Sequence, residues 1–297
     1  MKGERAKQRL KNGVYRALGE TASTLAGANG AGDDRLRVLM YHKVNDRPDN
    51  PLTVPVSLFD EQLAQLGELG FAVVDLDAVL DHYRSGVPLP RRPVLLTFDD
   101  GYRDNLENAA PVLRKYGYPA VLFVPVGCLD GAGMLPHEEA LAARGVLNPT
   151  LRWEELPEVH AAGIRVESHG VSHRALADLE LAEAEQELEV SKRLLEERLG
   201  RPVRAFAYVK GSEAHYRPEH VSLVRSAGYE LAFTSVSGAN DGGSNPLRLR
   251  RYNVEPYPAR TFELVLAGAC DLIRIKDTVA GTRARRLLNS ALGTTST

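Results

Sequence analysis

Two acidic residues in the first half of the chain stand where they could bind a metal ion and move a proton. Asp99 and Asp100 follow the apolar run Pro93–Phe98 and precede Gly101, which allows a tight turn. Adjacent carboxylates at the end of a buried strand are costly unless a metal ion or a proton compensates their charge. The pair therefore suits one carboxylate as a metal ligand and the other as a general base. An ordinary surface turn is the alternative interpretation.

Two histidines further along the chain have the spacing of a metal-binding pair. His169 and His173 lie at positions i and i+4, so a helical turn would put both imidazoles on one face. They follow an expected strand at Ile164–Val166. An isolated pair of this kind is more often coincidence than a ligand set. The pair gains weight if it shares one face of a barrel with the two aspartates.

The segments around these motifs alternate between strand-like and helix-like patterns. Short apolar runs that end at polar or glycine residues predict strands at 37–41, 71–74, 93–98, 120–124, 164–166, 205–208 and 231–234. Helical spacing of apolar residues predicts helices over 57–70, near 105–116 and near 179–199. This alternation indicates an α/β fold with a parallel sheet, and the number of units favours a closed or nearly closed (β/α) barrel.

A (β/α) barrel carries its chemistry at the carboxyl ends of its strands, and both motifs follow expected strands. Residues 127–160 are too irregular for assignment, and we expect them to form an insertion over one end of the barrel. We predict three parts of the chain: a basic N-terminal extension over 1–35, a barrel domain over 36–276 and a tail over 277–297.

The overall composition is that of a soluble globular protein, with 43% hydrophobic and 26% charged residues. The net charge of -2 gives no electrostatic basis for nucleic-acid binding, so we expect no nucleic-acid partner. Residues 1–20 are basic and weakly amphipathic, which suggests either a solvated leader or a weak membrane-surface contact. They lack the apolar core of a secretory signal, so we expect a cytoplasmic protein.

The two motifs together resemble those of a known enzyme family. Thr97–Gly101 with Ser168–His173 is similar to the first two motifs of the polysaccharide deacetylases, carbohydrate esterase family four. The resemblance implies a distorted (β/α) barrel of the NodB type. Leu39–Val44 resembles the opening strand of the branch that includes poly-N-acetylglucosamine deacetylases. The similarity extends from about Arg35 to about Lys276.

The resemblance implies a metal-dependent enzyme that hydrolyses the acetamide of N-acetylhexosamine units in a polysaccharide or glycolipid precursor. By this resemblance Asp100, His169 and His173 bind the ion, and Asp99 is the general base. Two imidazoles and one carboxylate with an open position suit zinc, with cobalt, nickel or iron as other candidates. The expected partner is an N-acetylated glycan or sugar substrate.

A third motif departs from the family pattern. The family has Arg-x-Pro-Tyr-Gly or Ala-Tyr-Pro-Tyr-Gly at this point, whereas this chain has Ala-Tyr-Val-Lys-Gly. By resemblance Tyr208, Lys210 and Gly211 line the sugar site and help to hold the oxyanion. The arginine that orients the base in the family has no counterpart at its usual place, and Arg250 or Arg251 could replace it.

The proton donor for the leaving amine also differs, because no Leu-x-His motif follows residue 220. His42 is our candidate, since it directly follows the first expected strand and an imidazole with a pKa near 6.5 can donate a proton near neutrality. A histidine that only orients a ligand is the alternative interpretation, and Lys210 is a weaker candidate. Four other histidines show no ligand spacing: His137, His160, His215 and His220.

Two other functions remain compatible with these residues. A deformylase, or a hydrolase of another small amide, could use the same metal site. The altered third motif, with Val209 and Lys210, would also suit a glycan-binding protein whose catalytic site has decayed. The intact acidic and histidine motifs argue against decay, because unused buried charges are costly to keep.

Overall fold

The structure is a computed structural model that describes residues 13, 34–47, 52–129, 135–143, 145–268, 271 and 277–283. The basic segment 1–20, for which the sequence suggests a membrane-surface contact, lies outside the described residues except for residue 13. Among the described helices none is both long enough and apolar enough to cross a bilayer.

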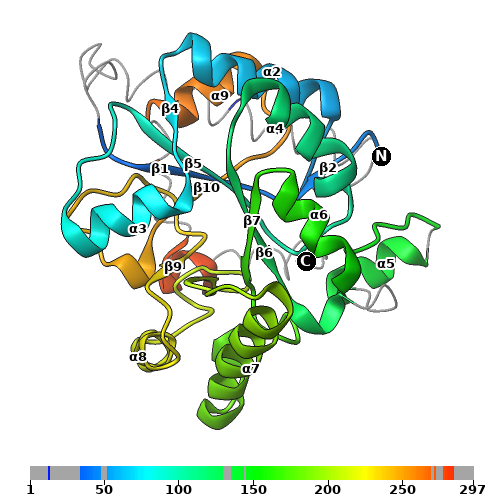
Figure 1. Cartoon of the computed structure of the whole chain (residues 1–297), viewed down its shortest axis with the longest axis vertical. Helices are drawn as coiled ribbons and strands as arrows, with labels where there is room; N and C mark the ends of the chain where they lie inside the picture. The colour runs from blue at the N-terminus through cyan, green and yellow to red at the C-terminus, as the bar shows by residue number, and fades with distance from the viewer. Residues whose placement is uncertain are drawn as a thin grey trace.

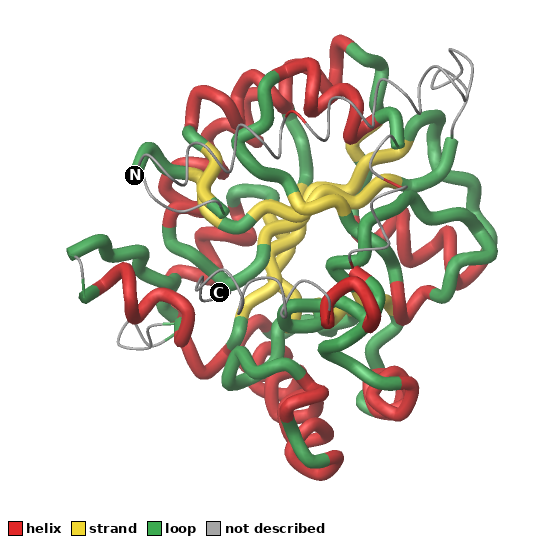
Figure 2. Tube along the Cα trace, turned by 180° about the vertical axis from the view of Figure 1, so that it is seen from behind, coloured by secondary structure: helices red, strands yellow, loops and turns green. Residues whose placement is uncertain are grey.

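Parallel strands occupy the centre of the molecule, and helices surround them (Figure 1, Figure 2). The main sheet has the order β10-β1-β5-β6-β7-β8-β9, and β4 pairs with β5 beside this path. Its strands are β1 Arg37–Tyr41, β4 Ala72–Val73, β5 Pro93–Phe98, β6 Ala120–Val124, β7 Ile164–Ser168, β8 Ala205–Ala207, β9 Leu231–Phe233 and β10 Tyr252–Asn253. A separate parallel pair follows β1 in the chain and consists of β2 Lys43–Val44 and β3 Thr53–Val54.

Helix α3 has a capping residue at each end. It begins where the Asp75 carboxylate accepts the Ala78 backbone N–H at 2.8 Å, and it ends at Gly86 with φ 70°. A π-helical turn at Asn105–Ala109 precedes α4. The helices are α2 Val56–Glu68, α3 Leu76–Ser85, α4 Ala110–Tyr116, α5 Glu139–Ala142, α6 Leu156–Ala161, α7 Leu181–Leu199, α8 Pro218–Ser226 and α9 Ala259–Leu266.

The segment 249–253 brings the two edges of the curled sheet together. Leu249 forms a parallel bridge with Phe233 of β9, and β10 then pairs with β1. The expected α/β fold with a nearly closed parallel barrel is therefore confirmed. All seven expected strands are present, with ends that differ by at most two residues, whereas β10, α8 and α9 were not predicted.

Successive residues of the central strands are buried on opposite faces of the sheet. Val38 and Leu95 belong to an inner apolar cluster, whereas their neighbours Leu39 and Leu96 pack in a second cluster with the surrounding helices. This pattern explains why the strands are continuous apolar runs rather than alternating ones. A strand residue's position in this period of two therefore decides whether it faces the barrel interior.

The insertion at 127–160 lies over the carboxyl ends of the strands. The Leu151 backbone N–H donates to the Gly101 carbonyl at 2.9 Å, and Arg103 donates to the Pro149 carbonyl at 2.9 Å. These bonds attach the insertion to the loop that follows β5. The short helices α5 and α6 give the segment more regular structure than its sequence indicated.

The described part of the expected C-terminal tail packs against the barrel. The Asp277 carboxylate accepts hydrogen bonds from the backbone N–H and the hydroxyl of Ser237, at 3.2 and 3.1 Å. The Asp277 carbonyl accepts the Glu213 backbone N–H at 3.1 Å, and Thr282 is buried. Residues 277–283 therefore contribute contacts to the domain.

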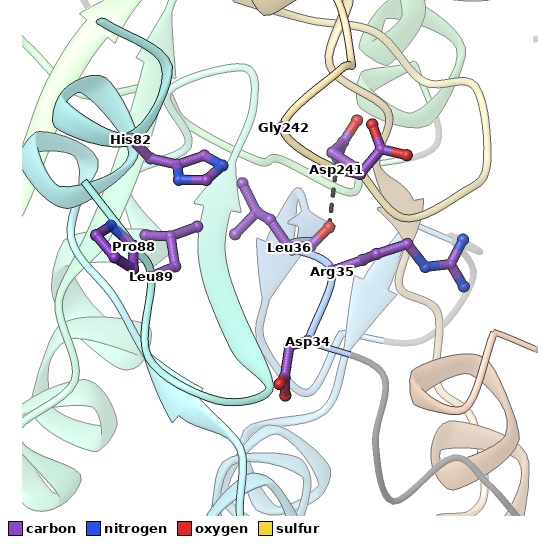
Figure 3. A pocket seen from close by; sticks show the side chains of 9 residues that line it. Asp34, Arg35, Leu36, His82, Pro88, Leu89, Asp241 and Gly242 are labelled. Atoms are coloured by element: carbon purple, nitrogen blue, oxygen red, sulfur yellow. Dashed lines mark hydrogen bonds between the residues drawn. The ribbon is translucent and has the colours of Figure 1, made fainter. Parts of the chain in front are cut away.

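A pocket opens at the opposite end of the barrel, at the amino ends of β1 and β5 (Figure 3). Residues that precede these two strands form part of its wall, where Leu36 and Asn240 exchange two backbone hydrogen bonds of 2.8 Å. This end of a barrel usually serves stability rather than chemistry. The lining residues are Asp34, Arg35, Leu36, His82, Pro88, Leu89, Asn240, Asp241 and Gly242.

Candidate metal centre and active site

The two aspartates lie in a tight turn directly after β5. The strand ends at Phe98, Asp100 has φ 76° and Gly101 has φ 66°. A positive φ is uncommon for a residue other than glycine, and such strained positions concentrate at functional sites. Asp99 and Asp100 are both 3% exposed. The strand thus ends where the sequence required, so that neighbouring carboxylates can enter one site.

Asp99 faces the barrel interior and is held there by an arginine. It continues the inner column of β5, and each of its carboxylate oxygens accepts a hydrogen bond of 2.7 Å from the Arg251 guanidinium. Arg251 is fully buried, and its Nε donates to the Thr234 carbonyl at 2.9 Å. Arg251 rather than Arg250 therefore holds the Asp99 carboxylate in its orientation.

The Arg251 guanidinium also controls the charge of Asp99. Burial by itself opposes ionisation, but Arg251 and the nearby His169 outweigh it and hold the pKa of the Asp99 carboxyl below its usual value. The group is consequently a carboxylate at neutral pH, in a fixed orientation. A general base needs both properties.

The histidine pair lies in an irregular loop after β7, so the expected helical turn is wrong. His173 has φ 56°, a left-handed conformation that no helix contains. The Glu187 carboxylate of α7 shapes this loop by accepting the backbone N–H groups of Val171 and Ser172, at 2.6 and 2.9 Å. The rings of His169 and His173 still lie 5.2 Å apart, because the loop folds back on itself.

Asp100 and the two histidines form a cluster that fits a divalent ion. Asp100 Oδ1 lies 2.9 Å from His173 Nε2 and 3.5 Å from His169 Nε2, and one ligand atom of each residue lies within 4.8 Å of the others. His169 Nδ1 lies 2.8 Å from the Ala207 carbonyl, which can only accept, so this nitrogen carries the proton. The Nε2 lone pair of His169 is thereby left for an ion, as in most histidine ligands.

The charges of this cluster favour a cation between its members. Burial opposes ionisation of Asp100, but His173 and His169 outweigh it and hold the pKa of the Asp100 carboxyl well below its usual value. Burial likewise disfavours charged His169, but Asp100 and Asp99 outweigh it and raise the pKa of this imidazole. A divalent ion requires neutral imidazoles, so ion binding competes with protonation of His169.

His42 follows β1 at its carboxyl end, where the charges of Asp100 and Asp99 act on its ring. Its Nδ1 is buried and has no hydrogen-bond partner among the described residues. Burial lowers the pKa of the imidazole, although attraction by Asp100 and Asp99 partly offsets this effect. The neutral ring is therefore its resting form near pH 7. The sequence suggested instead an imidazole with an unperturbed pKa near 6.5.

The side chains of the third motif differ in their burial. The Tyr208 hydroxyl donates to the Leu247 carbonyl at 3.1 Å, and its ring stacks on Tyr216 at 4.5 Å. Tyr208 is 1% exposed, and burial raises the pKa of its hydroxyl. The structure therefore places the Tyr208 side chain in the core and not in a substrate site.

Lys210 lies at the surface of the loop after β8, whereas the adjacent Gly211 is buried. Lys210 is exposed with φ 59°, so it shares its unusual backbone conformation with Asp100 and His173. Gly211 has φ 56°, and a Cβ at this position would lie 2.6 Å from the Ser235 backbone nitrogen. Only glycine fits at position 211, and Lys210 beside it is an exposed cation.

One imidazole that the sequence gave no reason to select also reaches the cluster. His137, from the insertion, places Nε2 3.6 Å from Asp100 Oδ2, and its ring lies 5.3 Å from that of His173. The motif spacing carries no signal for this residue, because the insertion folds back over the barrel from a distant part of the chain.

A parallel barrel with two aspartates and a histidine pair at one end of its strands defines a class of (β/α)-barrel hydrolases. Comparison with known proteins gives the family: the profile for polysaccharide deacetylases matches residues 86–232, which include both motifs. The chain belongs to the polysaccharide deacetylases of the NodB type and is a hydrolase that acts on carbon–nitrogen bonds.

Two curated relatives illustrate this membership. YxkH of Bacillus subtilis (strain 168), assigned to the polysaccharide deacetylases, is 29% identical over 223 residues, which cover 75% of this chain and 72% of that protein. The poly-beta-1,6-N-acetyl-D-glucosamine N-deacetylase of Escherichia coli (strain K12) is 36% identical over 91 residues. That second match covers 30% of this chain but 13% of the E. coli protein.

Several solved structures share this fold over most of the length of this chain. IcaB from Ammonifex degensii has a TM-score of 0.66 and 26% identity, and the match covers 80% of this chain and 97% of that one. A Streptococcus pyogenes deacetylase, PplD, has a TM-score of 0.67 and 23% identity, with coverages of 78% and 98%. The latter similarity concerns the fold alone.

Proposed function

We propose that the protein is a divalent-ion-dependent de-N-acetylase that hydrolyses the acetamide of N-acetylhexosamine units in a glycan. The observation that carries this proposal is the pairing of two adjacent sites. An ion-binding cluster at Asp100, His169 and His173 lies beside an ionised Asp99 that Arg251 fixes through two hydrogen bonds. Zinc is the ion that this donor set suits best.

The chain's own residues divide the work of amide hydrolysis. A divalent ion, when bound, supplies a Lewis acid that activates water and polarises an acyl oxygen. Asp99 accepts a proton from the attacking water at a carboxylate oxygen, and Arg251 keeps that carboxylate ionised and oriented. Asp100 acts as a ligand of the ion rather than as a base, because its Oδ1 faces the two imidazoles.

Proton delivery to the leaving amine falls to His42 in this proposal. Its neutral resting form can take up the proton from Asp99 within the cycle and pass it on, because its unpartnered Nδ1 lies in the same buried site. Lys210 is an exposed cation in the loop after β8, where an ammonium can hold a sugar hydroxyl or the oxyanion.

The substrate class rests on similarity to named relatives. The E. coli relative deacetylates poly-beta-1,6-N-acetyl-D-glucosamine by its name, and its matched segment is 36% identical to this chain. We therefore propose N-acetylglucosamine, in a polysaccharide or glycolipid precursor, as the sugar.

Acetate release from N-acetylglucosamine oligosaccharides tests this function. The full chain is stripped with a chelator, assayed, resupplied with one equivalent of zinc, cobalt, nickel or iron(II), and assayed again. We expect acetate only after an ion is returned. Formate from N-formyl sugars without acetate from N-acetyl sugars would identify a deformylase instead. Glycan binding without release of either acid would identify a binding protein.

A further inference from the structure

A buried chain of polar side chains runs from the barrel to the insertion. Lys43 Nζ donates to Glu138 Oε1 at 2.5 Å, and the Tyr102 hydroxyl donates to the same oxygen at 2.9 Å. The other oxygen of Glu138 accepts from Asn148 Nδ2 at 2.7 Å. Burial opposes ionisation of Glu138, but the bonds from Lys43 and Asn148 outweigh it and lower the pKa of this carboxyl. Glu138 is thus a fixed acceptor.

His137 lies at the far end of this series of hydrogen-bonded side chains. Its Nε2 lies 2.8 Å from the Tyr102 hydroxyl oxygen. Because the hydroxyl hydrogen goes to Glu138, the tyrosine oxygen must accept, and His137 Nε2 carries the hydrogen that it accepts. The chain of bonds therefore fixes both the tautomer and the orientation of the His137 ring.

The His137 ring faces Oδ2 of Asp100, the carboxylate oxygen that lies away from the two proposed histidine ligands. His173 and His169 lie against Oδ1 of Asp100, whereas His137 Nε2 lies 3.6 Å from Oδ2. A carboxylate that binds an ion through one oxygen must be prevented from rotating about its terminal bond. An N–H group held beside the second oxygen opposes that rotation electrostatically.

We propose that His137 is a positioning residue of the metal centre, which fixes Asp100 Oδ2 so that Oδ1 faces the ion. The inference rests on the proposed function, because it requires an ion at Asp100. His137 does not bind the ion through Nε2, since that nitrogen donates to Tyr102. The insertion thereby becomes part of the active site rather than a cover over the barrel.

Cobalt(II) titration of the full chain against a competing chelator tests this role without any turnover. We expect His137→Ala to weaken cobalt binding by about 10- to 100-fold, the usual effect of losing an outer partner of a metal ligand. His137→Gln should restore much of the affinity, because its amide N–H reaches about as far as Nε2. His160→Ala is the matched control, since His160 is exposed on α6 and should leave cobalt binding unchanged.

The cobalt absorption spectrum separates a positioning residue from a ligand. With the same three ligands in place, the visible bands of His137→Ala should keep the wild-type position and intensity. Tyr102→Phe should weaken binding in the same direction, and it should add little to His137→Ala because both act through one chain of bonds. The His137→Ala result decides the question if Tyr102→Phe fails to fold.

Three results would overturn the inference, and they point to different causes. Equal cobalt affinity in wild type and His137→Ala would remove His137 from the metal centre while leaving the proposed function intact. A changed cobalt spectrum in His137→Ala would make His137 a direct ligand. If the wild-type chain itself bound no cobalt or zinc, the proposed function would fall, and this inference with it.

Discussion

Replacing Arg251 by methionine removes the buried cation beside Asp99 while keeping a long side chain of similar volume. Arg251 is fully buried and forms both hydrogen bonds of 2.7 Å to Asp99. Breaking such a pair by removing one partner costs about 3–5 kcal/mol, because the remaining charge stays buried and unpaired. At roughly 2–4 °C per kcal/mol for a domain of this size, Arg251→Met should melt roughly 6 to 20 °C below wild type.

The pH dependence of this loss has a definite sign. In the wild type the folded pKa of Asp99 is lowered, so its stabilising contribution is present above the unfolded pKa near 3.9 and is lost as pH falls through the folded pKa. Without Arg251, burial raises the pKa of Asp99. The destabilisation should therefore be largest at neutral pH and should shrink in acid, where Asp99 becomes protonated in both proteins.

Thermal melts and pH–rate profiles of kcat/KM together measure this effect. The acid limb of the Arg251→Met profile should move to higher pH, because Asp99 acts only as the carboxylate. Arg250→Met is the matched control, since Arg250 is the neighbouring arginine and lies over Gly238. A variant Arg251→Met with the wild-type melting temperature and the wild-type acid limb would refute the role assigned to Arg251.

Four further predictions concern the ion, the proton path and the substrate. Asp100→Ala, His169→Ala and His173→Ala should each abolish stoichiometric zinc binding, measured by metal analysis on folded protein. One equivalent of bound zinc in any of these variants would contradict the ligand set. Zinc affinity should fall as pH falls through the raised pKa of His169, and a flat affinity between about pH 5 and 8 would disprove that competition. His42→Gln should keep the ion and lower kcat by about 10²- to 10⁴-fold, so unchanged turnover would remove His42 from the proton path. Lys210→Gly and Lys210→Ala should raise KM equally. The glycine variant should have the larger free energy of unfolding, because only glycine adopts φ 59° without strain, and equal free energies of unfolding would contradict this.

The paired motifs were predictable because local chemistry and strand ends coincide in them. Pro93–Phe98 is continuous and apolar, so its abrupt end at Asp99 and Asp100 marks a strand that stops at a site. The same reasoning locates His169 after β7. The loop conformation around His173 was not predictable, since a distant carboxylate, Glu187, determines it.

Arg251 and Arg250 differ in burial, and the sequence shows this difference only if an extended segment is recognised there. Leu249 and Arg251 are fully buried, whereas Arg250 between them is partly exposed. This period of two would have favoured Arg251 once a strand was recognised there. The signal is weak because β10 spans two residues, Tyr252–Asn253.

His137 shows the limit of motif spacing. It reaches Asp100 because backbone pairing between Tyr102 and Thr150 and between Gly101 and Leu151 folds the insertion over the barrel. These contacts join segments about fifty residues apart in sequence, and no periodic pattern marks them. A residue brought in this way becomes visible only when the tertiary structure is known.

The most direct test compares acetate release by the wild type and by Asp99→Asn, with both proteins loaded with one equivalent of zinc. The substrate is an N-acetylglucosamine oligosaccharide, and zinc content is measured on the same samples. We predict that Asp99→Asn retains the ion and releases acetate at least about 100-fold more slowly, because a general base typically contributes about 10²- to 10⁴-fold. Equal rates with equal zinc, or no acetate from the zinc-loaded wild type, would contradict the account.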